Sequence, residues 1–337
     1  MIQNFVTAQI ASLPKTELHV HLEGSIQPAT VCALAARYGE AVSENGVRAR
    51  YAYENFAGFI QAFKWVTSLL REPQDYGLIA SELGKQLLEQ RVVYAEVTLS
   101  IGVMLWRNQD VRANFAAILE AVAHFTRRGL HFNFVFDAVR QFGAGAAMEV
   151  VKAAERCDSG AIVAFGIGGD ETSVPTEAFR EAYERAADGG LHLLIHAGET
   201  GGPEKIREAI ESLGVERVGH GIAAFRDPAL MDLLAERKIA LEICPASNVR
   251  TGALAQQLGV TPASMEQHPL PALLRHGIPI VLSTDDPAMF ETSLLDEYRN
   301  AARMGLTQDE LLRLVEMGFE NSFMTEAQRT AIATFQL

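Results

Sequence analysis

Short runs of apolar residues alternate along the chain with longer segments in which apolar residues recur every three to four positions. The short runs are rich in Val, Ile, Leu and Phe and carry few charges, as expected for parallel strands buried on both faces. The longer segments have the spacing of amphipathic helices. The expected strands cover residues 17–22, 92–99, 131–138, 161–167, 191–196, 217–220, 239–244 and 279–283.

Helices are expected between these strands, and glycines directly follow four of them, as is common where a helix ends. Eight strands that alternate with helices predict an α/β fold of the (β/α)8 TIM barrel class. An open, doubly wound sheet is the alternative. No linker-like segment interrupts the pattern, so we expect one domain over residues 1–337. The helices are expected at 114–128, 177–188, 203–213, 228–236 and 270–276, and the glycines are Gly129, Gly189, Gly214 and Gly277.

The connection between the first two expected strands is much longer than a barrel requires. Residues 27–89 are expected to form two or three extra helices that cover the barrel mouth. Within this segment Phe56, Phe59, Ile60 and Phe63 recur at helical spacing. Such a stripe either packs in the core or forms an apolar lid over a substrate, and the pattern leaves both interpretations open.

The composition restricts the classes of partner. The chain carries 29 basic and 42 acidic side chains, a formal net charge of −13, which disfavours nucleic acid and anionic membranes as partners. The three cysteines are scattered and form no Cys-x-x-Cys pair, which suits a reducing compartment. The N-terminal stretch lacks a secretory signal pattern, and no apolar run reaches bilayer length. We therefore expect a cytoplasmic protein, with its oligomeric state left open.

Polar residues suited to catalysis follow five of the expected strands. In a (β/α)8 barrel the carboxyl ends of the strands form one rim, and active sites lie there. His19 and His21 lie two apart in the first strand, so both imidazoles project to the same face and converge. The other strand ends contribute Gly168-Gly169-Asp170-Glu171, His196-Ala197-Gly198-Glu199, Gly219-His220-Gly221 and Ser283-Thr284-Asp285-Asp286.

This set matches the needs of a metal-dependent hydrolase. Three imidazole nitrogens and one carboxylate, with a position left for water, are typical of a catalytic zinc site. Zinc lowers the pKa of its bound water to about 7 and so supplies hydroxide at neutral pH. We predict that one Zn²⁺ per chain is bound by His19, His21, His196 and Asp285.

Glu199 and His220 are the candidates for proton transfer. Glu199 follows the third predicted ligand by three residues, so it can reach the reacting atoms without binding metal. His220 can hold the water or take its proton. Structural interpretations also exist: Glu199 as a helix cap, His220 as a turn residue, and Asp285-Asp286 as a turn or helix cap before Pro287. The histidines without such company are expected on the surface or in packing roles: His124, His131, His192, His268 and His276.

Together these motifs resemble the adenosine deaminase family of the metal-dependent amidohydrolase superfamily. The resemblance spans nearly the whole chain, from Leu13 to about Phe323. It implies zinc ligands at the four positions named above, protonation of the purine N1 by Glu199, and orientation of the attacking hydroxide by His220. The motifs that carry it are Leu18-His19-Val20-His21-Leu22-Glu23-Gly24, His196-Ala197-Gly198-Glu199, Gly219-His220-Gly221 and Ser283-Thr284-Asp285-Asp286-Pro287.

The resemblance implies an enzyme that hydrolytically deaminates a small 6-aminopurine nucleoside, adenosine or 2′-deoxyadenosine. In that reaction hydroxide adds to C6 while N1 is protonated, and the tetrahedral intermediate expels ammonia to leave the 6-oxo purine. Asp286 would contact N7 and the backbone of Gly169 would contact N3. Glu23 occupies the position that meets the ribose in the family. The aromatic residues expected to line the substrate site are Phe56, Phe59 and Phe63.

Three positions depart from the adenosine-specific pattern of the family, and all concern the surroundings of the sugar. Glu23 and Gly166 each stand where many adenosine deaminases have Asp. Residues 99–106 lack the Ser-Pro-His that is common there. A nucleoside with a larger group on N9, such as aminodeoxyfutalosine of the menaquinone pathway, is therefore the alternative substrate. Adenine ranks below both, because adenine deaminases of the family usually carry Asp where this chain has Gly219.

Other classes fit the residues less well. A catalytically silent purine-binding protein of the same fold is the non-enzyme alternative, but it would have lost at least one chemical group, and none is missing. A binuclear amidohydrolase usually needs a Lys or Glu at the end of the fourth strand, where residues 165–169 offer neither. The cytidine deaminase type of zinc site needs a Pro-Cys-x-x-Cys run that this chain lacks.

Overall fold

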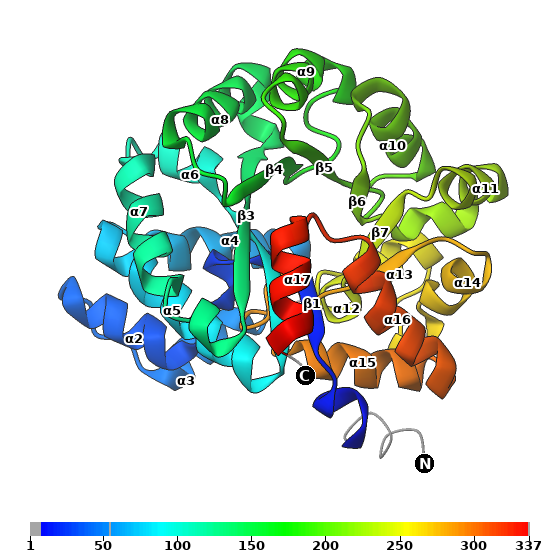
Figure 1. The fold of residues 1–337 in the computed structure, drawn as a ribbon, viewed down its shortest axis with the longest axis horizontal. Coiled ribbons are helices and arrows are strands. Elements are labelled where there is room, and N and C mark those ends of the chain that lie inside the picture. The colour runs from blue at the N-terminus through cyan, green and yellow to red at the C-terminus, as the bar shows by residue number, and fades with distance from the viewer. Residues whose placement is uncertain (1–7, 54, 336–337) are drawn as a thin grey trace.

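Eight parallel strands pair in chain order and form the centre of the molecule (Figure 1). The structure is a computed structural model and describes residues 8–53 and 55–335. A parallel bridge between Val20 and Asp285 joins the last strand region to the first and closes the ring. The predicted (β/α)8 barrel is thereby confirmed, and the open doubly wound sheet is excluded. The strands are β1 (Lys15–His21), β2 (Val92–Leu99), β3 (His131–Val139), β4 (Ile162–Gly168), β5 (His192–Ala197), β6 (Arg217–His220), β7 (Ala240–Ile243) and β8 (Ile280–Leu282).

The strand predictions agree closely with the structure, and the largest difference is at β1, which begins at Lys15 rather than at residue 17. A buried lysine is unexpected in a strand because burying an ammonium group is costly unless it is hydrogen-bonded. The Lys15 Nζ donates to the carbonyl oxygens of Ile10 at 2.9 Å and Leu13 at 2.6 Å. These bonds to the preceding turn let the strand start two residues early.

Helices surround the barrel as an outer ring (Figure 1). Several helix ends differ from the predictions, and the helix expected at 114–128 covers only Val111–Val122, with a separate 3₁₀ turn at Thr126–Arg128. The helix expected at 203–213 is α-helical only over α10 (Pro203–Glu208), and a π-helical turn (Ala209–Leu213) completes it. Gly189 is not in the left-handed conformation (φ −77°), and Gly190 (φ 81°) takes that role. The other helices after β2 are α6 (Ile101–Trp106), α7 (Val111–Val122), α8 (Gly143–Cys157), α9 (Arg180–Asp188), α11 (Pro228–Arg237), α12 (Pro245–Arg250), α13 (Ala253–Leu258), α14 (Leu270–Arg275), α15 (Leu294–Arg303), α16 (Gln308–Glu320) and α17 (Glu326–Phe335).

The long connection between β1 and β2 forms four helices in the described residues, rather than the two or three expected. The additional boundaries come from capping signals that the hydrophobic pattern does not register. The Ser43 Oγ accepts the backbone N–H of Gly46, and the Asn55 Oδ1 accepts that of Gly58, so each residue starts a helix of its own. The four helices are α2 (Pro28–Arg37), α3 (Glu44–Tyr51), α4 (Phe56–Thr67) and α5 (Pro73–Glu89).

A buried ionic network lies inside the barrel below the strand ends. Arg217 of β6 donates from Nε to Glu242 of β7 at 2.7 Å and from Nη2 to Glu96 of β2. All three side chains are buried. The guanidinium also stacks on Phe323, 4.0 Å from its ring centroid, and so joins this network to the segment between α16 and α17. Removing a charge from such a network leaves its partners buried and uncompensated.

The C-terminal helix α17 covers the opening at the amino ends of the strands, here called the lower opening. It lies over the centre of the barrel, next to β1, in Figure 1. Ile332 of α17 and Met324 pack against Leu18, Tyr94 and other residues at the amino ends of the strands. The lower opening is therefore sealed by apolar side chains, and the opposite rim is the one left for chemistry.

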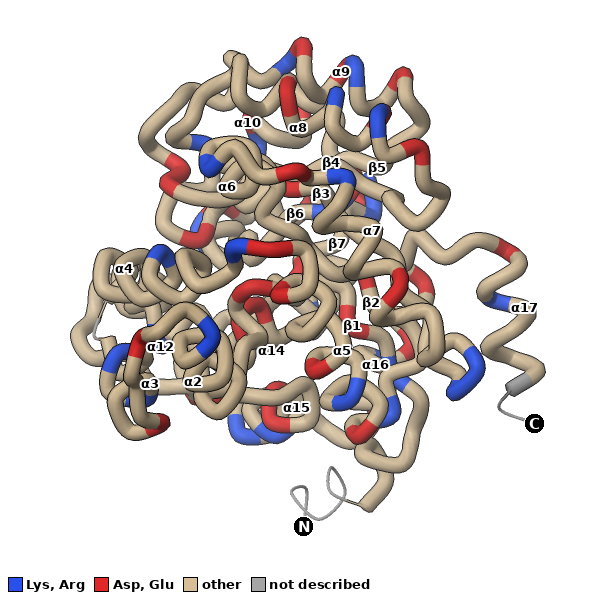
Figure 2. Tube along the Cα trace, turned by 90° about the vertical axis from the view of Figure 1, so that its left-hand side faces the viewer, with Lys and Arg blue, Asp and Glu red and all other residues tan. Residues whose placement is uncertain are grey.

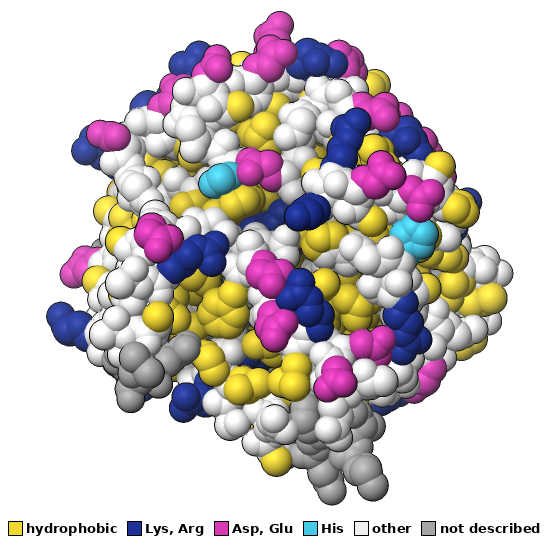
Figure 3. All heavy atoms as spheres, turned by 45° about the vertical axis from the view of Figure 1, so that its right-hand side comes forward, with side chains coloured by type: hydrophobic (Ala, Val, Ile, Leu, Met, Phe, Trp, Pro, Cys, Tyr) yellow, Lys and Arg dark blue, Asp and Glu magenta, His cyan; other side chains and the backbone are white. Residues whose placement is uncertain are grey.

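Charged residues are distributed over the outer helices, with acidic and basic positions interspersed (Figure 2). The face seen in Figure 3 carries Lys and Arg side chains between Asp and Glu side chains, without a block of one sign. None of the helices in the described part of the chain combines the length and apolar content that crossing a bilayer requires.

We predict that Arg217→Met lowers the free energy of unfolding by about 3–5 kcal/mol, because Glu96 and Glu242 would stay buried without their cation. Chemical denaturation of the metal-free protein, followed by circular dichroism, measures this loss.

The matched control is Arg313→Met, which removes pairs with Glu316 and Glu320 on the surface of α16. Exposed pairs contribute less than about 1 kcal/mol. Equal losses in the two variants would contradict the structural role given to the buried network.

Candidate active site

The closure of the barrel brings the two ends of the chain of strands together at the upper rim. The backbone N–H of His21 donates to the Asp285 carbonyl at 2.7 Å, and that of Asp285 donates to the His19 carbonyl at 2.9 Å. As a result, the Asp285 Oδ1 lies 3.2 Å from the His21 Nε2 and 3.6 Å from the His19 Nε2. Residues more than 260 positions apart thus form one cluster.

His196 from β5 and His220 from β6 complete this cluster. The Nε2 atoms of His196 and His21 are 3.3 Å apart. His19, His196, His220 and Asp285 each place one ligand atom within 4.8 Å of the others, a spacing that suits a metal ion. This group contains His220 where we predicted His21. The Nε2 of His21 nevertheless lies within 3.3 Å of both His196 and Asp285, so the predicted ligands and His220 form one cluster. The cluster also has a second grouping, in which Asp285 and Asp286 accompany His21.

Glu242, which the sequence did not single out, orients His19. Burial alone would raise the pKa of Glu242, but the charge of Arg217 and the bonds from His19 and Arg217 lower it to about 2. The ionised carboxylate accepts the Nδ1–H of His19 at 2.6 Å, so the lone pair of His19 Nε2 faces the cluster. This Nε2 is buried and has no hydrogen-bond partner within residues 8–53 and 55–335. A buried imidazole nitrogen with a free lone pair, held by a carboxylate from behind, is the arrangement of a metal ligand.

Two residues of the cluster adopt backbone conformations that L-residues rarely adopt. His220 has φ 60° and Asp285 has φ 65°. Such left-handed conformations in residues other than glycine cost energy and concentrate at functional sites. The rim has no room for a side chain at Gly219, because a Cβ there would lie 2.9 Å from the His19 Cε1. The space beside the imidazoles thus depends on that glycine.

Glu199 lies next to the cluster with its carboxyl group buried. Burial and the nearby carboxylates of Asp285 and Glu171 raise the pKa of Glu199 well above its ordinary value. A carboxyl group with a raised pKa keeps its proton to higher pH and is suited to act as a general acid. Its backbone is held by Glu171, which accepts N–H groups from Gly198 at 2.6 Å, Glu199 at 2.9 Å and Thr200 at 2.8 Å.

A cavity of about 670 Å³ opens onto the cluster. Its buried end includes Glu199, His220 and Asp286, and its exposed end includes Trp106 and Phe142. Asp286 has a buried Oδ1 without a partner among the residues described, and burial and Asp285 raise its pKa well above the ordinary value. The lining also contains these predicted residues: His21, Phe56, Phe59, Phe63, Gly169, His196 and Asp285.

Glu23 is the one predicted substrate residue that does not line the cavity. Its carboxyl group is buried and its Oε1 accepts the backbone N–H of Ser100 at 3.1 Å. Ser100 in turn lines the cavity. Glu23 therefore lies behind the cavity wall in this structure and positions residues at the start of α6.

The stripe of aromatic residues on α4 takes part both in core packing and in lining the cavity, the two roles that the pattern left open. Phe59 is buried and packs against Phe290, with ring centroids 5.2 Å apart. Phe56, Phe59 and Phe63 also line the cavity. The same helix therefore packs in the core and forms part of the roof of the site.

Asp137 near the end of β3 lines the cavity and was missed by the sequence reasoning. It pairs in register with Gly166 of β4, where a Cβ would lie 3.0 Å from the Asp137 Oδ1. Gly166 and Asp137 thus explain each other: the glycine gives room for a carboxyl group from the neighbouring strand. Burial raises the pKa of Asp137 to about 7. The signal available in the sequence was a lone acidic residue in the apolar run 132–139.

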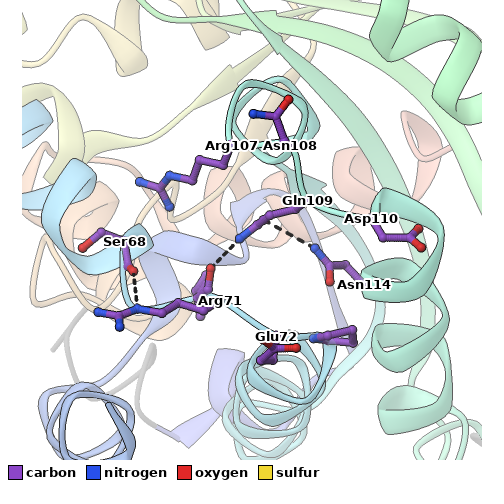
Figure 4. Close-up of a pocket in the computed structure, with 10 residues that line it drawn as sticks. Ser68, Arg71, Glu72, Arg107, Asn108, Gln109, Asp110 and Asn114 are labelled. Carbon is purple, nitrogen blue, oxygen red and sulfur yellow. Dashed lines mark hydrogen bonds between the residues drawn. The ribbon is translucent and has the colours of Figure 1, made fainter. Parts of the chain in front are cut away.

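A second cavity of about 550 Å³ lies beside the first and shares Ser68 and Arg107 with its lining (Figure 4). Its polar groups bond to their own walls: the Gln109 Nε2 donates to the Leu70 carbonyl at 2.6 Å, and the Arg71 Nε donates to the Ser68 carbonyl at 3.3 Å. It brings together no acid, base or ligand set like that of the first cavity, so we assign it no chemistry.

Comparison with known proteins connects this site to characterised chemistry. The family model for adenosine deaminase matches residues 14–334. The chain is 37% identical over 333 residues to an aminodeoxyfutalosine deaminase of Streptomyces coelicolor, covering 97% of this chain and 84% of the relative. It is 32% identical over 330 residues to an adenosine deaminase of Serratia proteamaculans, covering 95% and 97%. An amidohydrolase structure from Burkholderia ambifaria with bound Zn superposes with a TM-score of 0.86 at 25% identity, covering 99% of this chain and 92% of that one.

We predict that Glu242→Gln weakens binding of a divalent metal about 10- to 100-fold. Glu242 accepts bonds from both His19 and Arg217, and the single carbonyl oxygen of Gln cannot replace both carboxylate oxygens. Competition with a chromogenic chelator for Zn²⁺ measures the change.

Glu297→Gln is a matched control, because Glu297 is also fully buried but bonds Thr292, Ala246 and Asn300 away from the cluster. Unchanged affinity in Glu242→Gln would show that His19 does not depend on this carboxylate.

Proposed function

The chain belongs to the adenosine deaminase family, and from that premise we propose that it hydrolytically removes the 6-amino group of a purine nucleoside. The observation that carries the proposal is the buried carboxyl group of Glu199, whose pKa is raised, beside a cluster of three imidazoles and a carboxylate at the end of one cavity. Addition of water to C6 and loss of ammonia require an acid beside the ring and a group that orients the water, and these residues supply both.

A zinc ion fits the cluster as the resident metal. His19, His21, His196 and Asp285 lie together and offer the nitrogen-rich donor set that zinc prefers, and the orphaned Nε2 of His19 is left for a ligand. Bound there, zinc would supply Lewis acidity and lower the pKa of water to about 7. We propose one such ion per chain.

The residues around the cluster would divide the remaining work. Glu199 would donate its proton to the purine N1, which localises the ring electrons and makes C6 electrophilic. The Nε2 of His220 lies 3.6 Å from the Glu199 Oε2 and would orient the attacking oxygen. The carboxyl of Asp286, whose pKa is raised and whose buried Oδ1 is unpaired in the described chain, would donate to N7 when it carries a proton. The backbone of Gly169, across the cavity, would contact N3.

We propose aminodeoxyfutalosine as the preferred substrate, ahead of the adenosine that the sequence alone placed first. The segment 99–106, which departs from the adenosine-specific pattern, forms α6 and places Ser100, Val103 and Trp106 on the cavity wall. Trp106 is 66% exposed and stacks on Phe142 with ring centroids 5.9 Å apart. This exposed aromatic pair lies at the outer end of the cavity, away from the cluster. A larger group on N9 would bind against it.

Two cationic side chains in the cavity support a substrate whose N9 substituent is extended and acidic. Lys64 and Arg107 line the same cavity, and neither takes part in an ion pair with another described residue. Arg107 bonds instead to the carbonyl oxygens of Thr67 and Lys64. An acidic group on the substrate would therefore meet positive charge without displacing an existing carboxylate.

Adenosine is the second candidate, because a relative 32% identical over nearly the whole chain carries the name adenosine deaminase. Adenine ranks below both. The Asp expected at position 219 for adenine would not fit here, since even a Cβ at Gly219 would come within 2.9 Å of His19.

We predict that Glu199→Gln lowers kcat at least about 100-fold while zinc content and fold stay unchanged, because the amide has no proton to give to N1. Ammonia release and metal analysis on the same preparation measure both quantities. Glu204→Gln, at an exposed position five residues later, is the control and should keep full activity. Full turnover by Glu199→Gln would refute the role given to this residue.

The substrate is tested by ammonia release from adenosine, 2′-deoxyadenosine, adenine and aminodeoxyfutalosine in parallel. We expect the highest kcat/KM for aminodeoxyfutalosine. Faster turnover of adenosine would make the enzyme a nucleoside salvage deaminase. If none of the four released ammonia, the purine assignment would fail.

We further predict that Trp106→Ala lowers kcat/KM for aminodeoxyfutalosine about tenfold and changes that for adenosine less than about twofold, since an aromatic contact contributes about 0.5–1.5 kcal/mol beyond its buried area. Trp65→Ala is the matched control, because Trp65 packs against Arg50 and does not line the cavity. Equal losses for both substrates would contradict a specific contact between Trp106 and the larger group on N9.

A further inference from the structure

A chain of three buried polar side chains leads from the backbone of α14 to His220. The backbone N–H of Leu270 donates to the His268 Nδ1 at 3.1 Å. The His268 Nε2 lies 3.1 Å from the Asn248 Oδ1, and the Asn248 Nδ2 lies 3.1 Å from the His220 Nδ1. His268, Asn248 and His220 are all buried, so each of these groups needs its partner. The packing role expected of His268 is therefore incomplete.

The direction of every hydrogen bond in this chain follows from its first member. A backbone N–H can only donate, so the Nδ1 of His268 accepts and carries no proton. The neutral ring of His268 then carries its proton on Nε2 and donates to Asn248. This bond requires the amide oxygen of Asn248 to face His268, and its NH₂ group therefore faces His220.

The last bond determines the tautomer of His220. Since the Asn248 NH₂ group donates, the His220 Nδ1 must accept, and the neutral ring carries its proton on Nε2. That Nε2 lies 3.6 Å from the Glu199 Oε2 and 3.9 Å from the Asp285 Oδ2, at the centre of the site. His220 thus points an N–H group, rather than a lone pair, toward the reacting atoms.

The opposite orientation of the Asn248 amide is disfavoured by its contact with His268. Rotating the Asn248 amide by 180° would place its NH₂ group against the Nε2–H of His268, so that two donors would face each other in a buried site. An unsatisfied buried polar group costs about 1–3 kcal/mol. The left-handed backbone of His220 keeps its ring between Asn248 and Glu199.

We propose that His268 and Asn248 are positioning residues that fix His220 as the Nε2–H tautomer, a hydrogen-bond donor that holds the attacking oxygen rather than a base that deprotonates it. The identity of that oxygen rests on the proposed deaminase function, whereas the tautomer does not. Both residues act through His220, because neither lines the cavity.

The tautomer is measured directly, without substrate. Long-range ¹H–¹⁵N spectra of zinc-loaded protein labelled with ¹⁵N-histidine distinguish protonated from unprotonated ring nitrogens, and loss of signals in His220→Gln identifies those of residue 220. We expect a protonated Nε2 and an unprotonated Nδ1 on His220. A protonated Nδ1 would overturn the proposal even if the enzyme deaminates purines.

Substitutions of His268 test the relay through kcat. His268→Gln can accept from Leu270 and donate to Asn248, so we expect nearly full kcat and the same tautomer. His268→Leu can do neither, so we expect kcat to fall about 10- to 100-fold with KM changed less than about threefold, and a mixture of tautomers on His220. Equal kcat in the two variants, at wild-type level, would overturn the proposal.

Asn248→Asp provides a second test, because the side chain keeps its size but cannot donate to His220. We expect the proton of His220 to move to Nδ1 and kcat to fall at least as far as in His268→Leu. An unchanged spectrum in folded Asn248→Asp would overturn the relay. If this variant does not fold, the His268 pair and the wild-type spectrum decide.

Discussion

Glu242 is the residue on which both the barrel interior and the site depend. One carboxylate oxygen accepts the Nε–H of Arg217 at 2.7 Å, and the other accepts the Nδ1–H of His19 at 2.6 Å. Two buried charges are stable together only when their hydrogen bonds are complete. The carboxylate meets that condition for the arginine below it and orients the imidazole above it. The stability of the barrel and the direction of a proposed metal ligand are therefore parts of one network.

The closure of the barrel places a second constraint on the site. The backbone of Asp285 bonds to both His19 and His21, and its carboxylate is then fixed against the two imidazoles and the hydroxyl of Ser247, 2.7 Å away. The left-handed conformations of His220 and Asp285 are maintained because the surrounding strands and bonds leave no relaxed alternative. Such strain is sustainable on a rigid scaffold, which explains why these residues lie directly at strand ends and not on long loops.

Around this rigid rim the cavity is formed by less regular elements. Helices α4 and α6 and the turn that ends at Phe142 supply its aromatic residues, and all three belong to connections rather than to the strands. The division agrees with the general behaviour of the fold, in which the rim supplies the chemistry and the connections supply the specificity. In the proposed function the reaction class therefore follows from residues at the strand ends, while the group attached to the purine would be recognised by residues on α4 and α6.

The sequence by itself predicted the eight-stranded barrel and placed the histidines and Asp285 at one rim, because strand spacing and the common direction of parallel strands follow from the local pattern. It did not show the four separate helices of the β1–β2 connection, whose boundaries depend on caps at Ser43 and Asn55. Only the tertiary structure brought Glu242 to His19, across 223 positions, and Asn248 to His220, across 28. Such partners are chosen by the closing of the barrel, since no local pattern encodes which distant side chain will lie 3 Å away.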